Sequence, residues 1–104
     1  MPETISPEQA NELILGGGFD VVDVREPSEW STGHVPGARL VPLRDLREHP
    51  KSALPRDGVI FVCAAGVRSA TAARLAIENG LSRVYNMNGG TRGWVRAGLE
   101  LVRD

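Results

Sequence analysis

The sequence has 104 residues, of which 41% are hydrophobic and 24% are charged, and its formal net charge is -1. The length predicts a single domain over residues 1–104, and the composition is typical of a folded chain rather than a disordered one. Twelve basic residues against thirteen acidic ones provide no general positive field, so we expect binding neither to nucleic acid nor to a membrane surface.

No stretch of the sequence predicts export or membrane insertion. The first residues are acidic and are followed by no apolar segment of the kind that secretory signals contain. The longest apolar run, residues 59–65, is much shorter than the roughly 20 residues of a membrane-spanning helix. We therefore expect a cytoplasmic protein. The single cysteine, Cys63, excludes an internal disulfide, and together with two histidines it cannot supply the usual zinc ligands.

The first half of the chain alternates helix and strand signals. Ser6, Pro7 and Gln9 form a capping box with proline in the first turn, which predicts a helix that ends at the glycines of residues 16–18. The β-branched run at 21–24 predicts a strand covered on both faces. Shorter elements are expected to follow in this order: one helical turn at 28–30, a turn-rich segment at 33–38, a strand at 40–41, and a helix at 42–49 that Pro50 closes.

The second half contains the strongest strand signal. Residues 59–62 form an apolar run without polar alternation, which predicts a strand at the centre of the sheet. An alanine-rich helix is expected at 69–79, with Ser69 or a neighbour as its N-cap and Gly80 beyond its end. A strand at 84–87 and a short helix at 91–97 complete the chain. This alternation predicts an α/β fold with a mainly parallel sheet and helices on both faces.

Cys63 stands where α/β proteins place their sites, directly after the central strand and before a helix. The small residues at 64–66 allow the loop to curl so that backbone N–H groups point inward, and the following helix adds its positive end. Such surroundings favour the thiolate, which is the nucleophilic form of cysteine, and Arg68 offers a planar cation to an anionic substrate. The alternative is an inert buried cysteine, but Gly66, Arg68 and the helix start favour anion recognition.

Four segments resemble, in order and spacing, the motifs of the rhodanese-like domains: residues 22–26, 33–38, 62–69 and 88–98. The resemblance implies a rhodanese-like three-layer α/β fold, with a mainly parallel five-stranded sheet flanked by helices. It also implies that Cys63 is the catalytic residue and carries sulfur as a persulfide. The rest of the implied substrate-binding loop is Ala64, Ala65, Gly66, Val67 and Arg68.

One departure from the family pattern bears on the substrate. Many family members that use thiosulfate carry extra cationic or hydroxyl side chains in this loop, whereas Ala64, Ala65 and Val67 are apolar. This argues against thiosulfate as the physiological donor.

The resemblance implies a sulfurtransferase that works in two half-reactions. The Cys63 thiolate takes the outer sulfur of a small anionic donor such as thiosulfate. A thiophilic acceptor then removes this sulfur; we expect cyanide to serve in vitro and a thiol or thioredoxin-like protein in the cell. No metal and no organic cofactor is required.

Two alternatives stay open. The first alternative to a sulfurtransferase is a sulfur carrier or partner-binding module without turnover. The second is a cysteine phosphatase or arsenate reductase on a related scaffold. Phosphatases of this kind place one residue more between cysteine and arginine than the four found between Cys63 and Arg68. An arsenate reductase is further disfavoured because no second cysteine can resolve its intermediate.

The remaining polar residues of the motifs receive mainly structural interpretations. Asp23 and Arg25 are expected to support the sheet end beside the site, with Arg25 also available to an approaching substrate, and Ser69 is a further supporting candidate. His34 is expected to be a turn histidine bonded to nearby backbone. Arg92 is expected to be a solvated surface charge.

Overall fold

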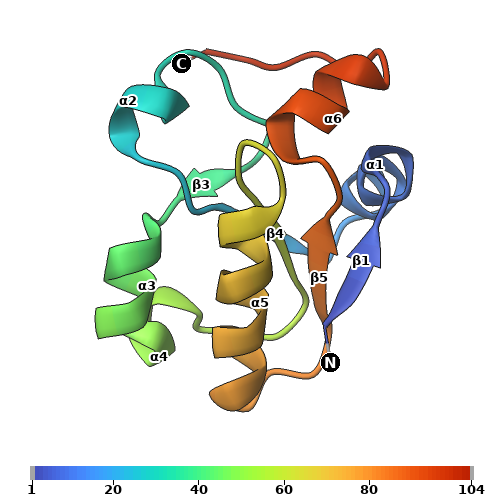
Figure 1. The fold of residues 1–104 in the computed structure, drawn as a ribbon. Coiled ribbons are helices and arrows are strands. Elements are labelled where there is room, and N and C mark those ends of the chain that lie inside the picture. The colour runs from blue at the N-terminus through green and yellow to red at the C-terminus, as the bar shows by residue number, and fades with distance from the viewer. Residues whose placement is uncertain (1, 104) are drawn as a thin grey trace.

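A five-stranded parallel sheet forms the centre of the structure, a computed structural model that describes residues 2–103 (Figure 1). The strand order is β1-β5-β4-β2-β3, and each ladder between neighbouring strands is parallel. The strands are β1 (Glu3–Ile5), β2 (Asp20–Asp23), β3 (Arg39–Leu40), β4 (Val59–Val62) and β5 (Val84–Met87). The predicted α/β fold with a five-stranded sheet is therefore confirmed, and β4 is its central strand as expected.

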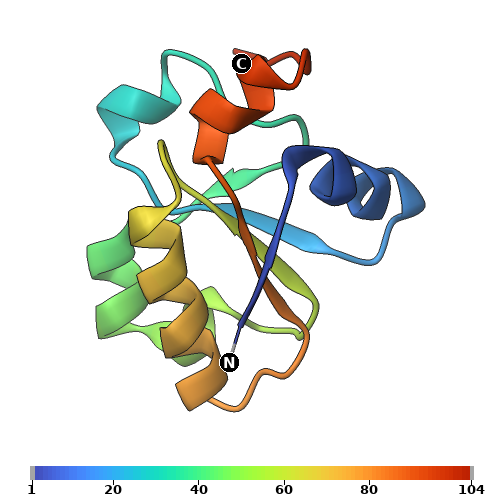
Figure 2. The same cartoon turned by 45° about the vertical axis from the view of Figure 1, so that its right-hand side comes forward.

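Helices cover both faces of the sheet, which gives the three layers seen in Figures 1 and 2. One face packs against α3 (Leu43–Glu48), α4 (Pro50–Ala53) and α5 (Val67–Glu78), and the other against α1 (Pro7–Gly16) and α6 (Gly90–Arg96). The short helix α2 (Pro27–Trp30) lies with α6 and the loop before α5 at the carboxyl edge of the sheet. Among residues 2–103, no helix combines the length and the apolar character that a membrane span requires.

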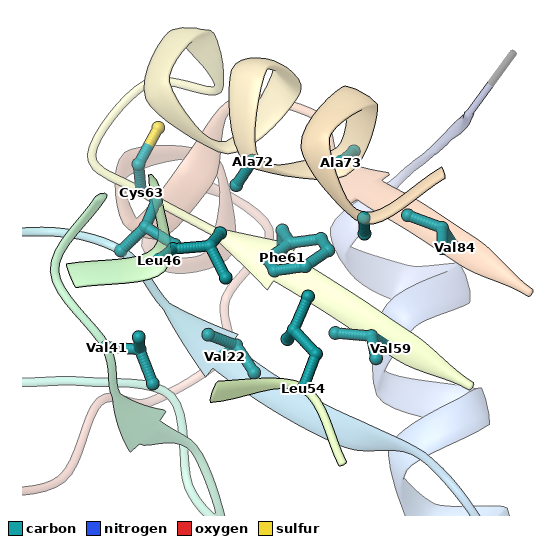
Figure 3. Close-up of a cluster of buried hydrophobic side chains, with 12 residues drawn as sticks. Val22, Val41, Leu46, Leu54, Val59, Phe61, Cys63, Ala72, Ala73 and Val84 are labelled. Carbon is teal, nitrogen blue, oxygen red and sulfur yellow. The ribbon is translucent and has the colours of Figure 1, made fainter. Parts of the chain in front are cut away.

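The central strand separates two apolar clusters. Successive side chains of a strand point to opposite faces. Phe61 therefore joins the cluster under α5 (Figure 3), whereas Ile60 and Val62 join the cluster under α1 and α6. All three are fully buried. An apolar run without alternation is what such double burial requires.

Local signals predicted several boundaries well. The capping box at the start of α1 is present: Ser6 Oγ accepts from the backbone N–H of Gln9 at 3.1 Å, and Gln9 Oε1 accepts from the N–H of Ser6 at 2.9 Å.

Two elements were not predicted. Residues 3–5 form β1, an edge strand in which only Ile5 is buried, and Pro50 begins α4 because proline suits the first helical position.

The start of α5 corrects one expectation. The helix begins at Val67, and its N-cap is Gly66 in the left-handed region, with φ of 100°. Ser69 is therefore not the N-cap; it lies inside the first turn with its side chain buried. The preference of serine for caps is overridden here by a buried polar contact, which is described below.

A buried ion pair joins the end of β2 to the segment that follows it. Arg25 Nη2 lies 2.8 Å from Asp23 Oδ2, and the two side chains are 5% and 0% exposed. Arg25 Nε also donates to Asp23, at 3.0 Å. Nη2 and Nη1 donate in addition to main-chain carbonyl oxygens, those of Gly33 at 2.8 Å and of Glu29 at 3.4 Å. The pair thereby fastens α2 and the turn at Gly33 to the carboxyl edge of the sheet.

Asp23→Ala is expected to lower the free energy of unfolding by about 3–5 kcal/mol, because it leaves the buried guanidinium of Arg25 without a counter-charge. Denaturant unfolding followed by circular dichroism measures this loss. Arg44→Ala is the matched control, since Arg44 pairs with Glu26 where both side chains are about half exposed, and its loss is expected to be much smaller. Equal losses in the two variants would contradict the fastening role of the buried pair.

Candidate active site

Cys63 is the first residue beyond β4 and opens the tight loop that leads into α5. Figure 3 shows its sulfur directed away from Phe61 and Leu46, so only the base of the side chain belongs to the apolar cluster. The backbone N–H of Gly66 donates to Cys63 Sγ at 3.0 Å, and Ser69 Oγ lies 3.3 Å from the same sulfur. The sulfur thus lies inside a ring of polar donors although the residue is only 1% exposed.

These contacts decide the ionisation state of the thiol. Burial opposes ionisation, but the hydrogen bonds from Ser69 and from the backbone N–H groups of Ala65 and Gly66 outweigh it, so the pKa of Cys63 lies below its ordinary value. Gly66 aims its N–H at the sulfur from a conformation that side-chain-bearing residues rarely adopt. The loop therefore favours the nucleophilic thiolate.

Ser69 and Asn86 form a polar network behind the sulfur. Ser69 Oγ donates to Asn86 Oδ1 at 2.6 Å, and Asn86 Nδ2 donates to the carbonyl oxygen of Gly66 at 3.2 Å. Because a hydroxyl carries one proton, Ser69 donates either to Asn86 or to the Cys63 thiolate. Asn86 lies on β5, so the network connects the loop to the neighbouring strand.

The start of α6 holds the other side of the loop. The backbone N–H of Thr91 donates to the carbonyl oxygen of Cys63 at 2.8 Å, and that of Arg92 to the carbonyl oxygen of Ala64 at 3.2 Å. Gly90 lies so close that a Cβ atom there would overlap the backbone of Cys63 and Ala64. The carbonyl groups of Cys63 and Ala64 thus have partners in α6, while the N–H of Gly66 binds the sulfur.

Arg68 lies at the end of the loop and is bound by a carboxylate. Its Nη1 and Nη2 donate to the two oxygens of Glu29 at 2.7 and 2.9 Å, and the side chains are 36% and 34% exposed. The hydrogen bond from Arg68 lowers the pKa of Glu29 to about 2, while that of Arg68 is raised. Both groups are charged near neutral pH, so the cation expected from the sequence is present but its charge is balanced.

The remaining loop side chains are apolar and face solvent. Val67 is 74% exposed, Ala65 is exposed and Ala64 is half-buried. Asp23 and Arg25 bind each other, and none of the described hydrogen bonds of Arg25 reaches Cys63. The side chains of Ala64, Ala65 and Val67 thus form an apolar rim on the solvent side of the site.

Two further motif residues behave as structural groups. His34 is buried, its Nδ1 lies 3.3 Å from the carbonyl oxygen of Val35, and its ring stacks on Trp30 with centroids 3.6 Å apart. The expected contact of His34 with nearby backbone is therefore confirmed. Arg92 is exposed, as expected of a surface charge.

Two side chains at the site were not predicted, Glu29 and Asn86. Their contacts join residues that are distant in the sequence: Glu29 to Arg68 across 39 positions, and Asn86 to Gly66 across 20. The only available signal was the polar Asn86 within an otherwise apolar strand. Glu29 offered none, because it stands in an ordinary exposed helical turn.

Cys63 lines neither of the described surface hollows, although Asn86 lines the smaller one. The larger, about 530 Å³, lies between α6 and the C-terminal segment, and its lining includes Thr32, Val95, Leu99 and Leu101. Within residues 2–103, no three His, Cys, Asp or Glu side chains gather closely enough to hold a metal ion. Hydrogen-bond geometry around the sulfur, rather than cavity size, therefore marks the candidate site.

Known proteins resemble this chain in sequence and in fold. The family model of the Rhodanese-like domain matches residues 6–97. Thiosulfate sulfurtransferase GlpE of Pseudomonas aeruginosa is 34% identical over 92 residues, which are 88% of this chain and 83% of that protein. An uncharacterized Bacillus subtilis protein, YqhL, is 38% identical over 74 residues, which cover 71% of this chain but only 59% of YqhL. The crystal structure of a rhodanese-related protein from Thermoplasma volcanium matches with a TM-score of 0.87 and 32% identity, over 98% of this chain and 99% of that one.

Ser69→Ala is expected to raise the pKa of the Cys63 thiol, because the anion loses its side-chain donor. The pH dependence of alkylation by iodoacetamide measures this pKa. The midpoint for the unaltered protein should lie below the free-thiol value of about 8.5, and the midpoint for Ser69→Ala should lie higher. Ser82→Ala, which removes an exposed hydroxyl that binds Asp57, is the control and should change nothing. An unaltered-protein midpoint at or above the free-thiol value would contradict anion stabilisation by the loop.

Proposed function

The chain belongs to the rhodanese-like domain family, and from this premise we propose that it is a sulfurtransferase that carries sulfane sulfur as a persulfide on Cys63. The observation that carries the proposal is the pair of polar contacts to the sulfur, the N–H of Gly66 at 3.0 Å and Ser69 Oγ at 3.3 Å. These donors stabilise an anionic sulfur without a metal or an organic cofactor. The named activity of the Pseudomonas relative supports the same reaction class.

In the first half-reaction the Cys63 thiolate attacks the outer sulfur of a small anionic donor such as thiosulfate. The S–S bond of the donor breaks, its electron pair leaves with sulfite, and Cys63 keeps one extra sulfur. The backbone of residues 64–68 surrounds the new terminal sulfur and stabilises its charge. Arg68 stands at the end of the same loop, where its guanidinium is bound by Glu29.

In the second half-reaction an acceptor attacks the terminal sulfur and releases the Cys63 thiolate. Cyanide serves as the acceptor in vitro and becomes thiocyanate, whereas a thiol or a thioredoxin-like protein becomes a persulfide. The donor product leaves before the acceptor binds, so the kinetics should be ping-pong. A carrier role would use the same persulfide but would stop after one equivalent unless a dedicated partner removed it.

Cys63→Ser is expected to abolish transfer of sulfur from thiosulfate to cyanide, because a hydroxyl forms no persulfide and does not ionise near neutral pH. Thiocyanate formation measures transfer, and circular dichroism checks that the fold is retained. Thiocyanate beyond one equivalent per chain distinguishes an enzyme from a carrier. If Cys63→Ser kept wild-type activity, Cys63 would not be the nucleophile.

The unaltered protein is expected not to hydrolyse p-nitrophenyl phosphate, because four residues between Cys63 and Arg68 make a ring that fits one terminal sulfur better than three phosphate oxygens. Insertion of one glycine after Ala65 enlarges the ring and should reduce sulfur transfer, while phosphate or arsenate gains access. Phosphatase turnover that exceeds sulfur transfer and disappears in Cys63→Ser would overturn the sulfurtransferase proposal.

A further inference from the structure

The carboxylate of Glu29 is held in place before any substrate arrives. Besides both terminal nitrogens of Arg68, its Oε1 accepts from the backbone N–H of Glu26 at 3.0 Å. Its carbonyl oxygen accepts from Arg25, which the buried pair with Asp23 immobilises. Glu29 is therefore a preorganised partner of Arg68 and not a mobile surface carboxylate.

This arrangement sets the charge that an incoming donor meets. The guanidinium of Arg68 and the carboxylate of Glu29 sum to zero net charge at the end of the Cys63 loop. A dianion gains little from a cation that is already neutralised, and it also approaches a fixed negative group. Arg92 is exposed beside the loop, where solvent and salt screen its charge.

The rest of the rim offers no polar side chain to an anion. Ala64, Ala65 and Val67 carry neither a charge nor a hydroxyl, and Val67 is 74% exposed. Apolar surface of this kind gains from contact with an apolar substituent, because both surfaces lose water. The site thus combines backbone donors for one sulfur with an uncharged, apolar surround.

We propose that Glu29 determines donor specificity by neutralising Arg68, so that the site prefers a singly charged sulfane-sulfur donor with an apolar substituent over the dianion thiosulfate. This inference rests on the sulfurtransferase function proposed above. The two donor types differ in charge and shape but deliver the same sulfur.

Methanethiosulfonate is the matched probe, because it is thiosulfate with a methyl group in place of one anionic oxygen. The Cys63 thiolate attacks its outer sulfur, the S–S bond breaks, and the electron pair leaves with methanesulfinate. Cys63 becomes the same persulfide anion that thiosulfate yields. The charges balance without a proton, an oxidant or a reductant.

The test is the ratio of kcat/KM for the two donors, with cyanide as the acceptor, in the unaltered protein and in Glu29→Gln. The unaltered protein should prefer methanethiosulfonate. Glu29→Gln keeps an oxygen for Arg68 but removes the charge, so kcat/KM for thiosulfate should rise about tenfold, mainly through KM, and that for methanethiosulfonate much less. Glu29→Ala should shift the ratio in the same direction if the glutamine variant folds poorly.

Glu26→Gln is the control for a general charge effect, since Glu26 lies in the same segment but pairs with Arg44 instead of Arg68. It should leave the donor ratio unchanged. An unchanged ratio in both Glu29 variants, or an equal change in Glu26→Gln, would overturn the assignment to Glu29. Absence of transfer from both donors in the unaltered protein would instead overturn the sulfurtransferase proposal, and this inference with it.

Discussion

The buried ion pair between Asp23 and Arg25 is the constraint on which the site is built. Burying two charges costs roughly several kcal/mol per ion, and it is tolerated only when hydrogen bonds satisfy both groups. Arg25 meets this condition by binding the carbonyl oxygens of Glu29 and Gly33 in addition to Asp23. The same bonds hold α2 against the sheet edge, and α2 in turn places the Glu29 carboxylate on Arg68.

The chemistry of the loop depends on backbone groups more than on side chains. Gly66 turns its N–H toward the sulfur, and the close approach of Gly90 lets α6 bind the carbonyl of Cys63. Both glycines have positive φ, of 100° and 59°. Because the loop binds the sulfur through the main-chain N–H of Gly66, the side chains at 64, 65 and 67 are free to set the polarity of the rim. In the sulfurtransferase that we propose, this division separates sulfur binding from donor selection within one short loop.

The sequence predicted those features that local signals determine. Residues 59–62 indicated the central strand because their burial on both faces requires an apolar run, and the spacing of Cys63, Gly66 and Arg68 indicated the loop. It did not predict β1, because an edge strand with one buried side chain lacks such a run. Ser69 was misassigned as a cap, and Glu29 was missed, because tertiary contacts with Cys63 and Arg68 decide their roles.

The central claim is that Cys63 holds one sulfur atom within the ring of donors. Intact-protein mass spectrometry after brief exposure to methanethiosulfonate or thiosulfate, followed by removal of the donor, tests it most directly. The chain should gain the mass of one sulfur atom, cyanide should remove this mass, and Cys63→Ser should show no gain. An unchanged mass with both donors, or the same gain in Cys63→Ser, would contradict it.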